Sequence, residues 1–210
     1  MRLQENISRI REIMGLLTEE KEISISDMVK KDQEIRQKEK FDTSIDLSNQ
    51  KQLKKLLGED PQKFLESINT KEDVEGVWLI SQHADNDIEL QKMILDLLES
   101  NKDMLSQKFN VPIKEILYGI AMLTDRVMVN TSTDDFSEIS SGIQMYGSQG
   151  GEFNGQWVPR PIEMDGEVYF FKTPEELYKD QNFLNRINLI RTDVGLPPLE
   201  DYVQNMQKYV

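Results

Sequence analysis

A histidine and two carboxylates lie close together in the segment Gln82-His83-Ala84-Asp85-Asn86-Asp87. His83 is the only histidine of the chain. Histidine titrates near neutral pH without perturbation, which suits it to general acid–base catalysis. The alternative is a core histidine whose two ring nitrogens are both hydrogen-bonded. The neighbouring carboxylates Asp85 and Asp87 make the catalytic interpretation as good as the structural one.

The same segment permits metal binding by His83, Asp85 and Asp87. One imidazole and two carboxylates suit Mg²⁺, Mn²⁺ or Fe²⁺. These acidic residues also stand where the following helix needs an N-cap, and Asn86-x-x-Glu89 is a capping pattern. We favour capping because N-caps select the same side chains. We therefore predict no cofactor, with a divalent metal as the alternative.

Further polar residues fall at or near the predicted core faces of other helices, among them Asp32, Arg36 and Asp125. A buried polar group without a partner costs about 1–3 kcal/mol, so these helices must converge in a polar network or an active site. In the active-site interpretation, Asp125 or Asp85 orients His83. The residues that would hold a substrate are Asp32, Gln33, Arg36, Gln82, Arg126, Gln144, Tyr146 and Gln149.

Two of these assignments have simple alternatives. Asp125 could instead bind a ligand cation, and Arg126 lies opposite the apolar stripe of its helix, as an ordinary surface arginine would. The segment Gln144 to Gly151 contains a Gly-Ser step, which can present backbone N–H groups to an anion. No Walker or dinucleotide fingerprint and no G-x-S-x-G elbow occurs, so Ser148 is a poor candidate nucleophile.

Composition excludes several classes of protein. The chain has 210 residues and a net charge of −13, which argues against binding to nucleic acid or to anionic membranes. It has no cysteine, so disulfides, thiolate catalysis and thiolate metal sites are excluded. The charges interspersed in residues 1–17 are unlike a secretory signal, and no apolar run approaches the roughly 20 residues of a membrane span. We expect a cytoplasmic protein.

The apolar spacing predicts a mainly α fold, an irregular multi-helix bundle with a small C-terminal β-hairpin. Asn154-Gly155 is the turn signal of the hairpin. We expect loops at residues 42–50 and, flexible and Ser/Thr-rich, at about 131–143. Helices are expected at about 27–40, 51–57, 61–68 and 70–83. An amphipathic helix with Leu90, Met93, Ile94, Leu97 and Leu98 in register follows the turn at residues 85–87. Further helices are expected at about 112–129, at 174–194 with a break near Asp180, and at 198–206.

We expect residues 1–26 to form a helical extension and residues 27–210 a single domain. In the extension, five apolar residues at 4-3-4-3 spacing form one seam, which is too short to be stable alone. The seam would dock on the body of the protein, on a second copy of the chain, or on a partner. Its residues are Leu3, Ile7, Ile10, Met14 and Leu17.

Several short motifs occur in order between residues 27 and 206. They are Asp32-Gln33-x-x-Arg36, Trp78-Leu79-Ile80-x-Gln82-His83-Ala84-Asp85-x-Asp87, Thr124-Asp125-Arg126-Val127, Gln144-x-Tyr146-Gly147-Ser148-Gln149, Pro161-Ile162-Glu163 and Val194-Gly195-Leu196-Pro197-Pro198-Leu199-Glu200-x-Tyr202. Together they resemble an uncharacterised bacterial domain family, a domain of unknown function. The resemblance implies no reaction, but it does imply that the dispersed polar residues form one recurring set. The chain departs from the family pattern in a longer connector between Asn130 and Gln144 and in an insertion around Met164 to Asn185.

Three functions are consistent with this pattern. The first is an acid–base enzyme, hydrolase-like, that acts on a small polar or peptide-like substrate through a site centred on His83. The second is a module that binds a ligand or protein without turnover. The third is a structural or interaction protein in which the polar network only fixes helix packing.

Overall fold

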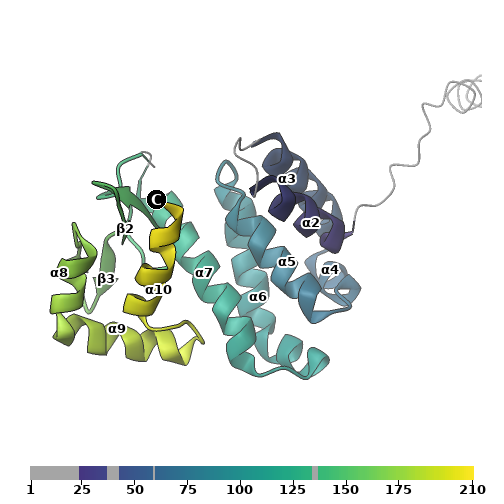
Figure 1. Cartoon of the computed structure of the whole chain (residues 1–210). Helices are drawn as coiled ribbons and strands as arrows, with labels where there is room; N and C mark the ends of the chain where they lie inside the picture. The colour runs from purple at the N-terminus through teal and green to yellow at the C-terminus, as the bar shows by residue number, and fades with distance from the viewer. Residues whose placement is uncertain (1–23, 37–42, 59, 134–136) are drawn as a thin grey trace, which may run out of the picture.

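A computed structural model of the chain describes residues 24–36, 43–58, 60–133 and 137–210. The protein is mainly α, as predicted, with two antiparallel hairpins, β1–β2 and β3–β4, in its C-terminal part (Figure 1). The elements in chain order are α2 (Ile25–Arg36), α3 (Thr43–Leu57), α4 (Pro61–Ser67), α5 (Lys71–Gln82), α6 (Ile88–Phe109), α7 (Ile113–Ser132), β1 (Gly150–Phe153), β2 (Gln156–Pro159), β3 (Ile162–Met164), β4 (Glu167–Tyr169), α8 (Pro174–Lys179), α9 (Gln181–Asp193), α10 (Leu199–Met206) and the 3₁₀ helix η1 (Gln207–Tyr209).

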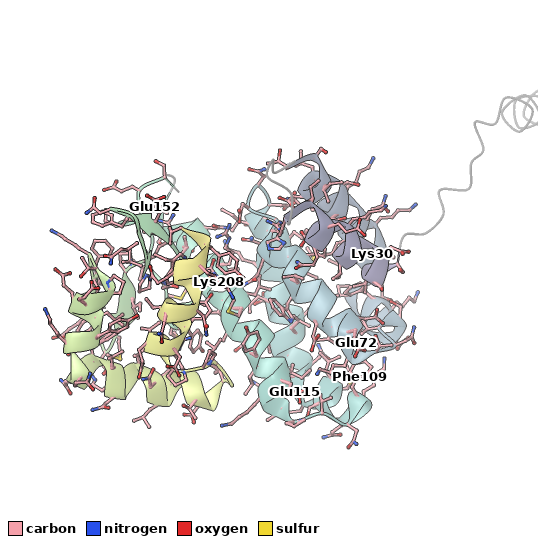
Figure 2. The ribbon with its side chains drawn as sticks, viewed as in Figure 1. Lys30, Glu72, Phe109, Glu115, Glu152 and Lys208 are labelled. Carbon is pink, nitrogen blue, oxygen red and sulfur yellow. The ribbon has the colours of Figure 1, made fainter. Side chains whose placement is uncertain are left out.

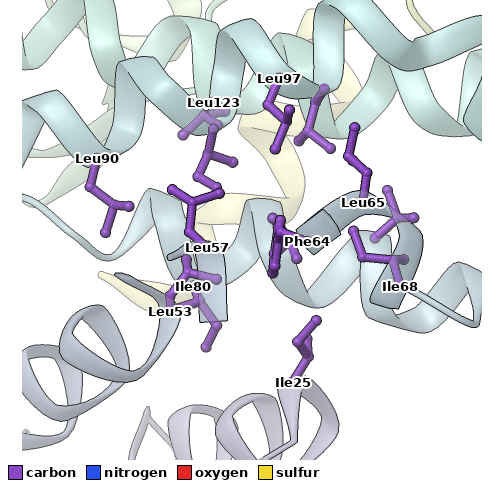
Figure 3. Close-up of a cluster of buried hydrophobic side chains, with 14 of the residues drawn as sticks. Ile25, Leu53, Leu57, Phe64, Leu65, Ile68, Ile80, Leu90, Leu97 and Leu123 are labelled. Carbon is purple, nitrogen blue, oxygen red and sulfur yellow. The ribbon is translucent and has the colours of Figure 1, made fainter. Parts of the chain in front are cut away.

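The elements form two groups with α7 between them (Figure 1). Helices α2 to α6 pack with α7 around one apolar cluster, whose residues include Leu53, Phe64 and Leu123 (Figure 3). The hairpins and α8 to α10 enclose a second cluster that includes Ile162 and Phe183. The side chains of both groups fill the space between their ribbons (Figure 2). Helix α7 therefore has the first core on one side and carries the contacts to the second group.

Helix α5 lies close to its neighbours because two glycines remove side chains at the contacts. A Cβ at Gly119 of α7 would overlap the ring of Trp78 on α5. A Cβ at Gly76 of α5 would overlap the side chains of Ile25 and Val29 on α2. This close packing fixes the C-terminal end of α5, where His83 lies, relative to both α2 and α7.

Local sequence signals predicted several helix ends correctly. Asp60 caps α4 and accepts hydrogen bonds from the backbone of Gln62 and Lys63, with Pro61 in the first turn. Thr70 and Asp73 form the expected capping box at the start of α5. Asp180 separates α8 from α9 and caps the latter. These signals succeed because each depends on residues within one turn of the chain.

The expected loop at residues 42–50 is wrong, because α3 begins at Thr43. The inward positions of its first two turns are polar: Asn49 and Gln50 are buried and the side chain of Asp46 is only 12% exposed. With Leu53 and Leu57 they follow helical spacing. The spacing of apolar residues could not predict this helix, because the side chains that its first two turns bury are polar.

The C-terminal β structure consists of the expected small hairpin and a second hairpin that includes Glu167 to Tyr169. Asn154-Gly155 joins β1 to β2 as predicted, and Asp165-Gly166 forms an equivalent turn between β3 and β4. All four turn residues have positive φ, between 53° and 79°, which suits the tight turns of twisted hairpins. Gln144 adds a single parallel bridge to Ile162 of β3.

Helix α7 continues to Ser132, a few residues beyond its expected end. In the described part of the following loop, Ile139 is buried. The guanidinium of Arg160 donates to the carbonyls of Glu138 and Ser141 at 2.9 and 2.7 Å. The apolar seam of residues 3–17 lies outside the described residues. Among the helices that are described, none combines the length and the apolar character needed to cross a membrane.

Candidate functional site

His83 is paired with a buried carboxylate that lies 51 residues earlier in the chain. Its Nδ1 lies 2.8 Å from Oδ1 of Asp32 on α2. The side chain of Asp32 is 0% exposed and that of His83 is 21% exposed. Because the carboxylate is the acceptor, the proton of a neutral His83 lies on Nδ1. Nε2 then keeps its lone pair.

Asp32 is held in turn by two neighbours on its own helix. Arg36 donates to Asp32 through Nε at 3.1 and 3.2 Å and through Nη2 at 3.0 Å. Gln33 donates to Oδ2 of Asp32 at 2.8 Å. Burial alone raises the pKa of Asp32, but the hydrogen bonds from His83 and Arg36 outweigh burial and hold that pKa below its ordinary value. Asp32 is therefore a fixed anion that orients His83.

Asp46 of α3 completes this cluster and was missed in the sequence. Nη2 of Arg36 reaches Oδ1 of Asp46 at 2.9 Å, so one guanidinium joins two carboxylates. Burial raises the pKa of Asp46, and the charge of Arg36 opposes that rise. The polar residues at helical spacing in α3 were the signal that could have identified Asp46. Asp32, Arg36, Asp46 and His83 are called the His83 cluster below.

The metal set considered for the sequence does not assemble. Asp85 pairs with Arg126, and Asp87 caps α6 by accepting from the backbone of Leu90 at 3.2 Å, as capping predicts. Oxygen and nitrogen atoms of Asp32, Asp46 and His83 do lie within 4.8 Å of one another. The guanidinium of Arg36 already bonds to both carboxylates, so a cation would have to displace it.

A second polar group links the turn after α5, helix α7 and the loop that precedes β1. It consists of Asp85, Gln91, Arg126, Asn130 and Gln149 and is called the Asp85 cluster below. Nε of Arg126 donates to Oδ1 of Asp85 at 2.7 Å, and Nη2 donates to Oδ2. Nη1 of Arg126 donates to Oε1 of Gln149 at 3.1 Å. The amide of Asn130 donates to Asp85 at 3.3 Å and to Gln91 at 2.8 Å. Arg126 is thus not the isolated surface arginine considered above.

Asp125 lies in a third group, the Asp125 clamp, and does not contact His83. It is 0% exposed. Its Oδ1 accepts from the backbone N–H groups of Met145 and Tyr146, and its Oδ2 accepts from that of Ser148, all at 2.8 Å. The expected N–H-rich loop therefore exists, but it binds the protein's own carboxylate. Burial raises the pKa of Asp125, and these N–H groups counteract the rise.

Gln144 and Tyr146 also support this loop. The amide of Gln144 donates to the carbonyls of Gln149 and Arg160, at 2.7 and 2.9 Å, and its Oε1 accepts from the backbone of Gln149. The Tyr146 carbonyl accepts from Arg191, which is fully buried. These contacts hold the chain around Asp125, and they assign Gln144 a structural part.

The predicted set therefore divides between three places. Asp32, Gln33 and Arg36 join His83, as the convergence argument required. Asp85 and Arg126 meet Gln149 in the neighbouring cluster. The expectation that Asp85 or Asp125 orients His83 is wrong, because the carboxylate that contacts the His83 ring is Asp32. The separation follows from α5: His83 at its end faces α2, and Asp85 in the following turn faces α7.

An open cleft of about 390 Å³ lies elsewhere, along the N-terminal half of α5. Lys71 pairs there with Glu75 at 3.3 Å and with Glu115 at 2.6 Å, and Lys114 donates to the Thr192 carbonyl at 2.8 Å. These pairs offer no acid–base group comparable to His83. Its lining residues are Lys71, Glu75, Lys114, Glu115, Tyr118 and Gly195.

In comparisons with known proteins, no family model, no curated protein and no solved structure matches the chain.

Proposed function

We propose that the protein is an acid–base enzyme of the hydrolase type, with His83 as the general base and Asp32 as the carboxylate that orients it. The observation that carries the proposal is the 2.8 Å contact between Nδ1 of His83 and a fully buried Asp32. A carboxylate on one ring nitrogen fixes the tautomer and leaves the other nitrogen free to take a proton. The substrate class is a small polar or peptide-like molecule.

Water is the nucleophile in this proposal. The chain has no cysteine. The buried Ser81 beside His83 donates its hydroxyl to the Val77 carbonyl at 2.7 Å. In the first step Nε2 of His83 takes a proton from water while the water oxygen bonds to the substrate carbonyl carbon. In the second step the carbon–nitrogen bond breaks, and His83 returns the proton to the leaving amine. His83 is neutral again at the end of the cycle.

The arrangement of charge supports a base at this position. Arg36 neutralises one of the two carboxylates Asp32 and Asp46, so the described part of the cluster keeps one negative charge when His83 is neutral. That charge stabilises the imidazolium that forms when His83 accepts a proton. The side chain of His83 is 21% exposed, so water can reach it.

The test is hydrolysis of a panel of N-acetyl dipeptide p-nitroanilides by wild type, His83→Gln and Asp32→Asn. We expect turnover by wild type and a loss of about 10²–10⁴-fold in kcat for His83→Gln, which is the usual contribution of a general base. Because His83 is the only histidine, its ¹⁵N chemical shifts report the tautomer without overlap. We expect the Nδ1–H form in wild type and a loss of that preference in Asp32→Asn.

Two results would refute the proposal. One is equal hydrolysis by wild type and His83→Gln across the whole panel, with both proteins folded. The other is an Nε2–H tautomer in the wild type, in which the only unprotonated ring nitrogen would be Nδ1, which faces Asp32. Unfolding curves of each variant serve as the control for loss of structure.

A further inference from the structure

Gln82, the last residue of α5, lies on the face of that helix that packs against α7. The contact region between α5 and α7 is called the junction below. On α5, Lys71, Trp78 and Gln82 share one face at helical spacing. Lys71 pairs with Glu115 near the start of α7, and the ring of Trp78 meets that of Tyr118 with centroids 5.9 Å apart. The two helices therefore run in the same direction, and Gln82 lies one turn beyond the Trp78 contact.

At that level, α7 presents the Asp85 cluster. Arg126 of α7 binds Asp85, which is three residues after Gln82, and the amide of Gln149 donates to the carbonyl of Met122 at 3.4 Å. Gln82 thus lies between the aromatic contact and the ion pair. The side chains of Asp85 and Arg126 are 41% and 24% exposed, so this part of the junction is open to solvent.

Two buried amide atoms of this junction have no hydrogen-bond partner in the part of the chain that the structure describes. They are Nε2 of Gln82 and Oδ1 of Asn130, in residues that are 8% and 3% exposed. The orientation of Asn130 is fixed by its neighbours. Gln91 must turn its amide nitrogen to the Ser81 carbonyl, so its oxygen faces Nδ2 of Asn130. Reversing the Asn130 amide would also oppose its oxygen to that of Asp85.

Such unpaired groups are rare in folded proteins, because each one lowers stability. One is a donor and the other an acceptor; Gln82 lies three residues before Asp85, and Asn130 lies about one helical turn after Arg126 on α7. A peptide chain offers the matching groups, a carbonyl for Gln82 and an N–H for Asn130, at successive positions. We propose that Gln82 and Asn130 bind the backbone of a short peptide.

This inference deepens the proposed function, because it names a peptide as the substrate and places its binding groups beside the base. Asp85 is two residues from His83, and its charge acts on the carboxyl of Asp46 in the His83 cluster. A peptide bound at the partly exposed ion pair would therefore lie on the α7 side of the turn that follows His83. The catalytic step depends on the proposed function, whereas binding can be measured without turnover.

The experiment is a ¹H–¹⁵N titration of the full chain with the neutral peptide N-acetyl-alanyl-alanine amide. Gln82→Met identifies the Gln82 side-chain signal, and Gln62→Met, at an exposed position of α4, is the matched control. We expect saturable shifts of the Gln82 and Asn130 side-chain amides. We expect affinity about tenfold weaker in Gln82→Met, which corresponds to the loss of one hydrogen bond, and unchanged in Gln62→Met.

Two further readouts separate binding from packing. A matched depsipeptide, in which an ester oxygen replaces the central N–H, should bind more weakly to wild type because it offers nothing to Asn130. Gln82→Met should unfold at the same or a higher temperature, because it removes an unpaired buried amide. A clear fall in its unfolding temperature with unchanged peptide affinity would overturn the inference, since Gln82 would then serve packing alone.

The inference is also overturned if the peptide causes no saturable shift in the millimolar range. His83→Gln separates the two proposals. If the peptide binds wild type and His83→Gln equally while neither hydrolyses p-nitroanilides, the peptide site stands and the acid–base function falls. If His83-dependent hydrolysis occurs and Gln82→Met leaves both affinity and KM unchanged, the reverse holds.

Discussion

Replacement of Asp125 by asparagine should destabilise the protein and loosen the loop at residues 145–148. The carboxylate accepts three backbone N–H groups at 2.8 Å, two on Oδ1 and one on Oδ2. An asparagine side chain can keep its oxygen toward Met145 and Tyr146. Its NH₂ group then faces the N–H of Ser148, so two donors oppose each other in a buried place.

The magnitude follows from these contacts. An unsatisfied buried donor costs about 1–3 kcal/mol, and Asp125→Asn creates two, on Ser148 and on the new amide. Met145 is 40% exposed, so the loop can move outward and recover part of the loss from water. We expect a decrease of about 2–3 kcal/mol in the free energy of unfolding, and a larger decrease for Asp125→Ala, which removes all three acceptor contacts.

Urea unfolding followed by circular dichroism measures this loss, and amide hydrogen exchange locates it. Exchange should accelerate at the amides of Met145, Tyr146 and Ser148 more than elsewhere in the chain. Asp103→Asn, at an exposed position of α6, is the matched control and should change stability by less than about 0.5 kcal/mol. An Asp125→Asn variant as stable as this control, with its loop amides still protected, would refute the reasoning.

Arg191 provides a second check on the same clamp. Burial lowers its pKa to about 10, and the charge of Asp125 is the largest influence in the opposite direction. Its guanidinium donates to the carbonyls of Pro197 and Tyr146. Asp125→Asn and Arg191→Met should therefore be non-additive, with a coupling of about 0.5–3 kcal/mol in a double-mutant cycle. Strict additivity would mean that the two groups do not act as one unit.

Three further predictions concern other groups. Asp32 has a lowered pKa and Asp46 a raised one. Ionised Asp32 therefore stabilises the folded protein above the unfolded pKa of about 4, and this contribution is lost as the pH falls through its folded pKa. Asp46 has the opposite effect: the folded protein loses stability as the pH rises from about 4 through the folded pKa of Asp46. Asp32→Asn should lower the unfolding temperature at pH 7, Asp46→Asn should keep or raise it, and both differences should shrink below about pH 4; equal effects of the two would contradict these directions. Lys108 donates to three carbonyls at the end of α4, the shortest at 2.6 Å to Ile68. Lys108→Met should therefore lower the free energy of unfolding in urea by about 1 kcal/mol. An equal effect of Lys51→Met, at an exposed position of α3, would contradict this prediction. Because Arg36 occupies the space between the two carboxylates, EDTA, Mg²⁺ and Mn²⁺ should leave the unfolding temperature unchanged; a metal-dependent rise that Asp46→Asn abolishes would instead identify a metal site.

The sequence predicted features that depend on neighbouring residues. The caps at Asp60 and Thr70, the helix break at Asp180 and the turn at Asn154-Gly155 all appear at the expected positions. Asp87, one of three candidate residues, caps α6. Each is decided by side-chain–backbone bonds or backbone dihedral angles within a few residues. Such preferences are written directly in the chain.

The site was predicted only in part. Polar residues at inward positions correctly indicated that α2 and the end of α5 converge, and the structure pairs Asp32 with His83. The same reasoning failed for α3, where Asp46 stands in a segment without apolar periodicity. It also failed to distinguish Asp125, which accepts hydrogen bonds from three backbone N–H groups of one loop. Side-chain types reveal that a partner is needed, but not which partner is used.

The sequence alone therefore determined the mainly α class, the ends of many helices and the polar residues that had to be satisfied inside. Tertiary structure decided which of these meet. His83 and Asp85 are two residues apart, yet they face α2 and α7 respectively. That division depends on how closely α5 approaches each neighbour, which Gly76 and Gly119 permit. Contacts between residues 41 and 51 positions apart arise from packing over the whole core, and no local pattern encodes them.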